Sequence, residues 1–358
     1  MDYQEHIFSG KTGWNQISHL VNQHSGSGIF ILMDENTRKF CLPILLEKCS
    51  GLDQAVLIKS KSGDENKTIL NINRIWEQLS ENHALRSSLL LCLGGGVISD
   101  MGGFAGATFK RGIHFVHIPT TMLAMVDAAI GGKTGVNLNS IKNQVGVFDQ
   151  PDAIFIFTEF LHTLPVKQKL SGYAEVIKHA MIDSKEHFDE LMLQNSPEKV
   201  CNDSQIIKSA NVKVNIVQQD PHENGLRKVL NYGHTIGHAV ESFSHLNDPQ
   251  PLSHGEAIAV GLLCESFISM RLLGFPENDL KRLSGLISDH FAHYHIKPKT
   301  TDLLLGLMAH DKKNFMKDKI NFTLLKEIGV PILDQTPSEN LIRESLHFYE
   351  NLDIDFFI

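Results

Sequence analysis

The sequence predicts an α/β domain with a parallel sheet, followed by a mostly helical domain. In the first half, short apolar runs alternate with helical patterns, which is typical of a parallel sheet covered by helices on both faces. From about residue 164 onward, long amphipathic or wholly apolar helical patterns replace that alternation. We therefore place the boundary so that the domains are residues 1–165 and 166–358. A chain of 358 residues is long enough for two hydrophobic cores.

Four apolar runs predict the strands of the sheet, and they lie at residues 28–34, 55–58, 87–93 and 115–118. Residues 69–79 carry apolar side chains at helical spacing, which predicts a helix between the second and third strands. In the second half, the clearest helix runs from Gly255 to Leu273. It is expected to end at Gly274 as its C-cap.

The composition favours a cytoplasmic protein. The net charge of −8 argues against nucleic acid or a membrane surface as a partner. No apolar run approaches the roughly 18 residues of a membrane-spanning helix, and the N-terminal residues lack the features of a signal peptide. The five cysteines form no CxxC pair, which favours reduced thiols. Because the net charge is negative, any positive charge that binds an anionic ligand must be local, inside a pocket.

Two histidines in the second half have the spacing of a metal site. His234 and His238 are four residues apart, which puts both rings on one face of a helix. Gly233 and Gly237 are expected to keep the neighbouring surface open. Imidazole and carboxylate ligands suit Zn²⁺, and three protein ligands leave one coordination position for chemistry.

Spacing alone predicts that Glu241 or Glu256 completes this metal site. The arrangement lacks the His-Glu-x-x-His order of zinc peptidases, so peptidase activity is not supported. A metal-dependent enzyme of another kind is the leading interpretation.

A glycine-rich segment, Gly94–Gly96, follows the third predicted strand and precedes a helical pattern. Glycines there allow the backbone to approach a pyrophosphate, whose charge the helix N-terminus favours. The spacing differs from GxGxxG, so a tight strand-to-helix turn explains it nearly as well. Asp34, at the end of the first strand, is a candidate for a ribose contact. Gly131–Thr134 looks like part of a P-loop, but Asp127 stands where the motif requires glycine, so we reject an NTPase.

Taken together, these segments resemble the 3-dehydroquinate synthases of the sugar-phosphate cyclase superfamily, from about Asp34 to beyond Leu325. The segments that carry the resemblance are Gly94–Asp100, Phe109–Gly112, Ile118–Thr121, Val126–Asp127, Gly131–Thr134, Lys142–Asn143, Ala174–Lys178, Glu223–Arg227, Leu230–Glu241, His254–Glu256 and Asp311–Asn314.

The resemblance implies an N-terminal Rossmann-like domain that binds NAD, a mostly α-helical C-terminal metal-binding domain and a cleft between them. It also implies that Zn²⁺ (or Co²⁺) is held by Glu175, His234 and His254. His238 would then face the substrate and transfer protons together with Glu223.

Further contacts follow from the same resemblance. The implied NAD contacts are Asp34, Asn36, Asp64, Lys67, Gly95, Gly96, Val97, Asp100, Thr120, Thr121, Lys133, Lys142, Phe160 and Thr163, with Glu65 as the alternative to Asp64. The implied substrate contacts are Asp127, Lys133, Asn143, Lys178, Lys213, Arg227, Asn231 and Lys313, with Lys312 as the alternative to Lys313. Arg111 would reach the phosphate bound by a neighbouring subunit, which implies a homodimer.

The implied substrate, 3-deoxy-D-arabino-heptulosonate 7-phosphate, carries a carboxylate and a phosphate. Several lysines and an arginine would bind these two anionic groups. In the implied reaction NAD takes and later returns a hydride, phosphate leaves by elimination, and the ring opens and closes by an intramolecular aldol step. The product is 3-dehydroquinate of the shikimate pathway, and the protein would be a carbon–oxygen lyase acting on phosphates.

Three alternatives stay open. A sister cyclase that makes 2-deoxy-scyllo-inosose or a valiolone would use a substrate without the carboxylate, whereas Arg227, Asn231 and Lys213 favour a substrate that has one. An NAD-dependent, metal-containing polyol dehydrogenase would release NADH and would not need the lysines. A catalytically silent homologue would not need the intact set of metal ligands.

Overall fold

The structure, a computed structural model, describes residues 6–139, 141–309 and 319–352. The chain divides into two compact units, one of residues 1–165 and 201–218 and the other of residues 166–200 and 219–358. The predicted boundary after residue 165 is one of the points where the chain passes from one unit to the other. The segment 201–218 returns to the first unit, which the predicted division did not include.

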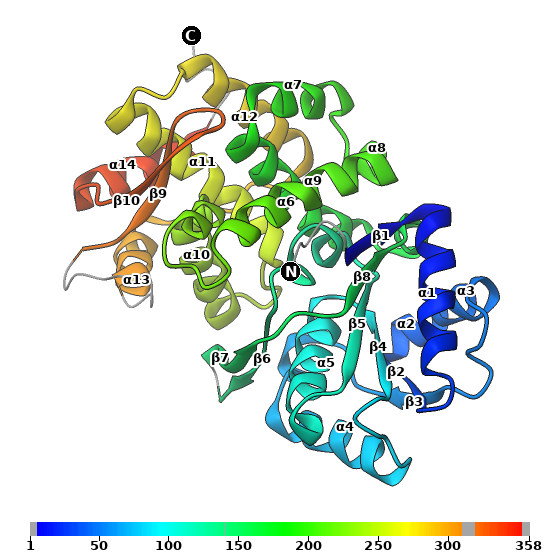
Figure 1. Cartoon of the computed structure of the whole chain (residues 1–358). Helices are drawn as coiled ribbons and strands as arrows, with labels where there is room; N and C mark the ends of the chain where they lie inside the picture. The colour runs from blue at the N-terminus through cyan, green and yellow to red at the C-terminus, as the bar shows by residue number, and fades with distance from the viewer. Residues whose placement is uncertain (1–5, 140, 310–318, 353–358) are drawn as a thin grey trace. The chain divides into compact units, whose positions relative to one another are not determined.

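The first unit is built on a six-stranded sheet in the order β1-β8-β5-β4-β2-β3, with every neighbouring pair parallel (Figure 1). The strands are β1 (Ile7–Ser9), β2 (Ile29–Met33), β3 (Val56–Lys59), β4 (Leu89–Gly94), β5 (His114–Pro119) and β8 (Ala153–Ile156). The four predicted strands are confirmed as β2 to β5. The sequence analysis missed β1 and β8, and the predicted fold class is confirmed.

Helices cover both faces of this sheet. The helices of this unit are α1 (Gly10–His24), α2 (Glu35–Phe40), α3 (Leu42–Lys48), α4 (Ile69–Glu81), α5 (Gly96–Thr108) and α9 (Asp203–Gln219). Phe30 and Leu32 of β2 share one core with Ile72 of α4 and Met101 of α5, because alternate residues of a strand face the same side. In Figure 1, α1 lies on the other face of the sheet. Burial on both faces explains why all five residues of β2 are buried and apolar.

Short helical turns and a hairpin complete the first unit. They are η2 (Asp64–Asn66), η3 (Phe109–Arg111), η4 (Ala124–Ala128), β6 (Lys133–Leu138), β7 (Ile141–Phe148) and η5 (Thr158–Thr163). The strands β6 and β7 pair antiparallel in a sheet of their own. Gly131–Thr134 therefore leads into a strand, whereas a P-loop leads into a helix.

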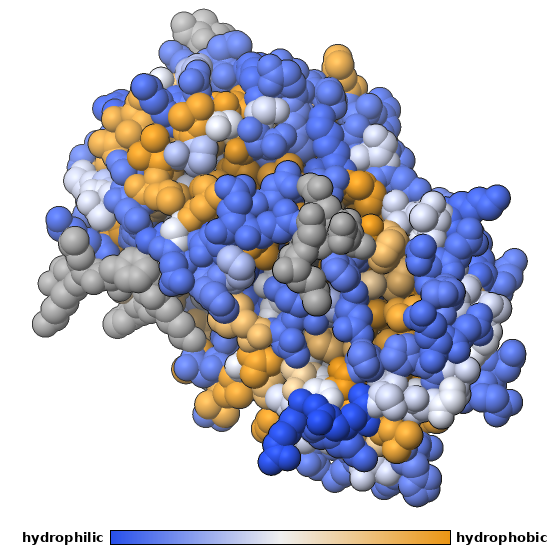
Figure 2. All heavy atoms as spheres, viewed as in Figure 1, coloured by the Kyte–Doolittle hydropathy of each residue, from blue (hydrophilic) through white to orange (hydrophobic). Residues whose placement is uncertain are grey.

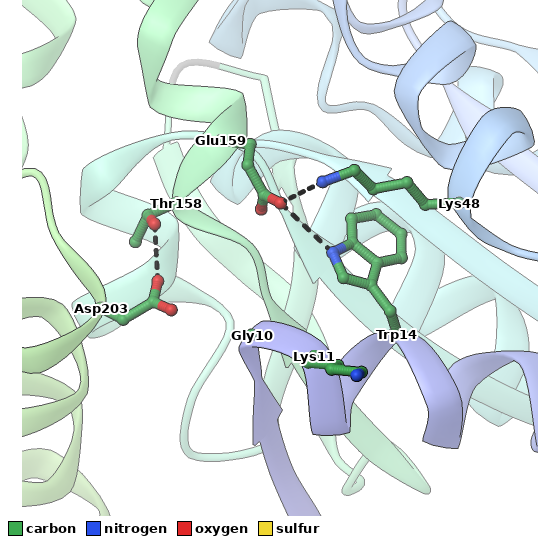
Figure 3. A pocket seen from close by; sticks show the side chains of 7 residues that line it. All are labelled: Gly10, Lys11, Trp14, Lys48, Thr158, Glu159 and Asp203. Atoms are coloured by element: carbon green, nitrogen blue, oxygen red, sulfur yellow. Dashed lines mark hydrogen bonds and ion pairs between the residues drawn. The ribbon is translucent and has the colours of Figure 1, made fainter.

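Polar contacts hold α1, α3, η5 and α9 around a pocket of the first unit (Figure 3). Glu159 accepts hydrogen bonds from the Trp14 indole, at 3.3 Å, and from the Lys48 ammonium group. Thr158 donates to the Asp203 carboxylate at 2.6 Å, which ties the first residue of α9 to η5. This contact is one reason why residues 201–218 belong to the first unit.

The second unit is mostly helical. Its elements are α6 (Val166–Asp183), α7 (Lys185–Gln194), α8 (Pro197–Val200), η6 (Leu226–Asn231), α10 (His234–Asn247), α11 (His254–Leu273), α12 (Glu277–His290), α13 (Pro298–Ala309), β9 (Phe322–Glu327), β10 (Val330–Gln335) and α14 (Glu339–Glu350). The predicted helix ending at Leu273 is confirmed as α11, and Gly274 caps it in the left-handed conformation. The hairpin β9–β10 was not predicted. None of the described helices is long and apolar enough to cross a membrane.

Helix α11 touches both α6 and the start of α10 at backbone distance. A Cβ added to Gly261 of α11 would lie 1.9 Å from the carbonyl oxygen of Gly233, which precedes α10. A Cβ added to Gly255, also in α11, would lie 2.4 Å from Cα of Ser171 in α6. Only glycine allows these two contacts, so any side chain would push the helices apart.

We predict that Gly261→Ala destabilises the protein by about 2–4 kcal/mol, because the new methyl group meets backbone that cannot move aside. The matched control is Gly285→Ala in α12, where a Cβ has no neighbour within 4 Å. This control should be as stable as the wild type or about 0.5–1 kcal/mol more stable. Urea unfolding of the three proteins measures both values. Equal stability of Gly261→Ala and wild type would contradict the backbone contact.

Candidate functional site

Three potential metal ligands meet inside the second unit. Glu175 lies in α6, and His234 and His254 are the first residues of α10 and α11. Nε2 of each histidine lies 3.3 Å from the same oxygen, Oε1 of Glu175. The ligand atoms of the three residues all lie within 4.8 Å of one another. One cation could therefore bind all three, as the resemblance implies.

Hydrogen bonds orient both imidazoles toward that point. Nδ1 of His234 donates to the carbonyl oxygen of Tyr232 at 3.0 Å, and Nδ1 of His254 donates to Oε2 of Glu241 at 3.1 Å. Because Nδ1 carries the proton in each ring, Nε2 presents its lone pair to the shared point. Two oriented imidazoles and a carboxylate are a donor set that fits Zn²⁺.

Charge reinforces this arrangement. Glu175 is fully buried and forms an ion pair with Lys178, one turn further along α6. Burial raises the pKa of Glu175, but Lys178 and His234 outweigh that effect and hold the pKa well below its usual range. Burial lowers the pKa of His254, whereas the carboxylates of Glu175 and Glu241 raise it to about 10 overall. The surroundings of His254 therefore favour a cation, which can be a proton on the ring or a metal ion.

The predicted histidine pair is confirmed as neighbours on one helix face, since the ring centroids of His234 and His238 lie 5.0 Å apart. His238, Glu241 and His254 form a second group within metal-binding reach. In that group, however, Glu241 already accepts the proton of His254. Glu256 instead accepts hydrogen bonds from the backbone and hydroxyl of Ser253, as the capping box of α11.

The expectation that Gly233 and Gly237 keep the surface open is wrong. A Cβ on Gly233 would lie 2.7 Å from Cδ2 of Leu262, and a Cβ on Gly237 would lie 2.8 Å from Cδ1 of Ile258. Both glycines face α11, and their small size lets that helix approach.

Sequence reasoning missed Glu265, which holds the start of α10 from inside α11. Its fully buried carboxylate accepts the backbone N–H groups of Gly233 at 2.7 Å and of Ile236 at 3.0 Å. Gly233 has no side chain to cap the helix, so Glu265 supplies the missing acceptor. The available signal was an acidic residue in the middle of an apolar helix, as Glu265 is in α11.

The segment before α10 carries two predicted substrate contacts, Arg227 and Asn231, and the predicted proton carrier Glu223. Asn231 donates to Glu223 at 3.1 Å, and the buried Arg227 donates to the carbonyl oxygen of Pro221 at 2.6 Å. Asp220, which was not predicted, shapes the loop by accepting the backbone N–H groups of residues 224, 225 and 227. These backbone hydrogen bonds outweigh burial and lower the pKa of Asp220.

In the first unit, most of the predicted NAD contacts follow the carboxyl ends of the parallel strands. Asp34 and Asn36 follow β2, Asp64 and Lys67 follow β3, Gly95, Gly96, Val97 and Asp100 follow β4, Thr120 and Thr121 follow β5, and Phe160 and Thr163 follow β8. From β2 the chain continues to β3 on one side of it and then crosses back to β4 on its other side. The strand order therefore reverses between β2 and β4. Ligands of open parallel sheets bind at such a reversal, on the carboxyl edge.

Local contacts limit how some of these residues could meet a ligand. Gly95 caps α5, and a Cβ on it would lie 3.0 Å from Cγ2 of Thr121 in the neighbouring loop. Oδ1 of Asp34 already accepts two backbone N–H groups at the start of α2. The side chain of Phe160 is buried against Trp14 and Phe157, so a ligand could reach only its backbone.

A buried lysine connects the loop after β3 to helix α5 and to the hairpin. Lys67, only 4% exposed, donates to Asp100 at 2.7 Å and to Asn143. Burial raises the pKa of Asp100, and the charge of Lys67 offsets part of that effect. Asn137, which was not predicted, donates to Oδ2 of Asp64 at 3.1 Å, and Lys142 lies 4.0 Å from the same oxygen.

The remaining predicted residues that the structure describes lie in the first unit. Lys213 of α9 donates to the carboxylate of Asp127 at 2.8 Å, within the first unit. Lys133 is exposed at the start of β6. Arg111 lies before β5, at the amino edge of the sheet. Lys312 and Lys313 lie outside the described residues.

Comparisons with known proteins cover most of the chain. Residues 57–171 match the profile of the 3-dehydroquinate synthase N-terminal domain, and residues 172–314 match that of the C-terminal domain. A 3-dehydroquinate synthase of Parabacteroides distasonis is 46% identical, over 90% of this chain and 91% of that protein.

Two solved structures have similar folds. A 2-deoxy-scyllo-inosose synthase complexed with carbaglucose-6-phosphate, NAD⁺ and Co²⁺ has a TM-score of 0.83 at 25% identity, covering 95% of each chain. The 2-epi-5-epi-valiolone synthase of Streptomyces hygroscopicus, with NAD⁺ and Zn²⁺ bound, has a TM-score of 0.82 at 24% identity, covering 97% of each chain.

We predict that His254→Ala loses bound metal, whereas His238→Ala retains it, because Nε2 of His254, together with that of His234, is directed to Oε1 of Glu175. Metal content per chain, measured by atomic emission after dialysis, distinguishes the two variants. Circular dichroism checks that both are folded. Equal loss of metal from both variants would refute the ligand assignment.

Proposed function

The chain belongs to the 3-dehydroquinate synthase family, and from this premise we propose that it converts 3-deoxy-D-arabino-heptulosonate 7-phosphate to 3-dehydroquinate and phosphate. The enzyme is a carbon–oxygen lyase of the shikimate pathway, which leads to the aromatic amino acids. The observation that carries the proposal is the buried group of Glu175, His234 and His254 beside Lys178.

The proposed cofactors are NAD and Zn²⁺ or Co²⁺. Glu175, His234 and His254 would hold the metal, and the carboxyl edge of the sheet would hold NAD. When bound, the metal polarises substrate hydroxyls and NAD accepts and returns a hydride. The two cyclase structures named above contain the same cofactors, which supports this assignment.

Side chains of the protein are proposed to bind the substrate carboxylate and to transfer protons. Arg227 and Asn231, fixed in the loop that Asp220 organises, suit a substrate carboxylate. His238 lies 5.8 Å, ring to ring, from the proposed ligand His254, and imidazole exchanges protons near neutral pH. Glu223, oriented by Asn231, is the second proposed proton carrier.

We propose this function over the two nearest alternatives, a sister cyclase and a polyol dehydrogenase. A sister cyclase would leave Arg227 without a substrate carboxylate. This chain is 46% identical to the synthase of Parabacteroides distasonis but 25% and 24% identical to the two sister cyclases. A polyol dehydrogenase would release NADH, whereas the proposed reaction regenerates NAD in every turnover.

We predict that the protein, with NAD and Zn²⁺ or Co²⁺, releases phosphate from the heptulosonate phosphate without net formation of NADH. Phosphate release and absorbance at the NADH band are followed together. Glucose 6-phosphate and sedoheptulose 7-phosphate, which lack the carboxylate, serve as comparison substrates. Turnover of only these two substrates would indicate a sister cyclase, and steady accumulation of NADH would indicate a dehydrogenase.

We also propose that the active enzyme is a cytoplasmic homodimer in which Arg111 reaches the phosphate bound by the partner. Arg111 lies at the amino edge of the sheet, and β5 separates it from Thr120 at the carboxyl edge by roughly 20 Å. The hairpin exposes four large apolar side chains, Leu138, Ile141, Val145 and Phe148. The face in Figure 2 shows apolar area where β6 and β7 lie, which supports contact with a second copy.

We predict that Arg111→Ala and His254→Ala are each nearly inactive but complement each other when co-expressed with different tags. In a mixed dimer, one site has intact metal ligands and receives Arg111 from the other chain. Random pairing should restore about a quarter of wild-type activity. No recovery in purified mixed dimers would show that Arg111 does not act across subunits.

A further inference from the structure

Another group of potential metal ligands in the helical unit belongs to neither the proposed metal centre nor the substrate residues. His293 and His295 lie in the segment between α12 and α13, and Glu350 is the last residue of α14. Nδ1 of His295 lies 3.2 Å from Oε1 of Glu350, and Nε2 of His293 lies 3.7 Å from Oε2. One ligand atom from each residue lies within 4.8 Å of the others.

The surrounding residues hold this group in place. The backbone N–H of Ile296 donates to Oε2 of Glu350 at 2.6 Å, which fixes the carboxylate. The ring of His293 stacks on Tyr349, with centroids 4.8 Å apart and planes 14° from parallel. Tyr349 is itself buried, and its hydroxyl accepts the backbone N–H of Tyr294 at 2.9 Å. Ligands oriented in this way lose little freedom when an ion binds.

The distances are close to those between ligands of one ion. Ligand atoms around a tetrahedral Zn²⁺ at about 2.0–2.1 Å are roughly 3.3–3.5 Å apart. Nδ1 of His295 lies 3.2 Å from Oε1 of Glu350, and Nε2 of His293 lies 3.7 Å from Oε2, so each imidazole approaches a different oxygen of the same carboxylate. Two nitrogens and one oxygen select Zn²⁺, Co²⁺, Ni²⁺ or Cu²⁺ over Mg²⁺ and Ca²⁺, which prefer oxygen alone. The His295 side chain is 77% exposed, so an ion can enter from solvent and keep a water ligand.

We propose that His293, His295 and Glu350 form a second binding site for a divalent transition-metal ion. The ion would join the connection between α12 and α13 to the end of α14. This proposal is independent of the proposed function, because it uses none of the residues assigned to that reaction.

The site has a direct structural connection to the loop before the first metal centre. Tyr294, between the two histidines, donates its hydroxyl to Asp248 at 2.9 Å. Ser244 also donates to Asp248, at 2.6 Å, and accepts the backbone N–H of Leu252 at 2.9 Å. Leu252 is two residues before His254. A metal ion that fixes the histidines on either side of Tyr294 would therefore also brace this loop.

The test is a Zn²⁺ titration of the chelator-treated whole chain in competition with a chromogenic chelator. We expect two ions per wild-type chain and one per chain of His293→Ala/His295→Ala. The matched control, His19→Ala/His245→Ala, removes two exposed histidines elsewhere and should still bind two. The difference between the two double variants isolates this site, whatever the Glu175 centre binds. Equal stoichiometry for the two double variants would overturn the proposal.

A second variant separates loss of the ligand from loss of structure. Glu350→Gln removes the charge but keeps an oxygen that can accept the N–H of Ile296. We expect the affinity of the second Zn²⁺ to fall at least tenfold, with the first unchanged and the circular dichroism spectrum as in the wild type. An unchanged second affinity in a folded Glu350→Gln protein would also overturn the proposal.

Discussion

The backbone contact between α10 and α11 is the constraint on which the proposed metal centre depends. Gly261 packs against the carbonyl of Gly233, so the residue that follows, His234, starts its helix directly beside α11. Glu265 of α11 then accepts the N–H groups at the start of α10. Packing and hydrogen bonding thus fix the same helix end. The imidazole that this end carries has its position set before any ligand binds.

Charge at the centre follows from that packing. Because the helices meet without intervening side chains, Glu175 is fully buried and must find its partners within the protein. Lys178 supplies one positive charge, and the imidazoles of His234 and His254 face the other oxygen. Glu241 adds a second carboxylate behind His254. Because two carboxylates, those of Glu175 and Glu241, face His254, a cation is stable there.

The sequence predicted the parts of this protein that depend on local patterns. The apolar runs identified β2 to β5. The three residues of β1 are too few to stand out as a strand, and β8, which is as long as the predicted β3, was overlooked. Spacing brought His234 and His238 to one helix face but could not supply Glu175. That residue lies 79 positions before His254, and only helix packing brings them together. The family resemblance supplied Glu175, whereas Glu265, Asp220 and Asn137 act through backbone or loop contacts that no spacing reveals.

Burial distinguishes the two histidine–carboxylate groups for which we propose a metal ion, the one around Glu175 and the one around Glu350. Both offer two imidazoles and one carboxylate with hydrogen-bonded surroundings. Around Glu175 the carboxylate is fully buried, so an ion there would interact through a low dielectric and could polarise a bound hydroxyl. Around Glu350 the His295 side chain is largely exposed, so water competes with the protein for the ion. The first group therefore suits chemistry, and the second suits a weaker, structural ion.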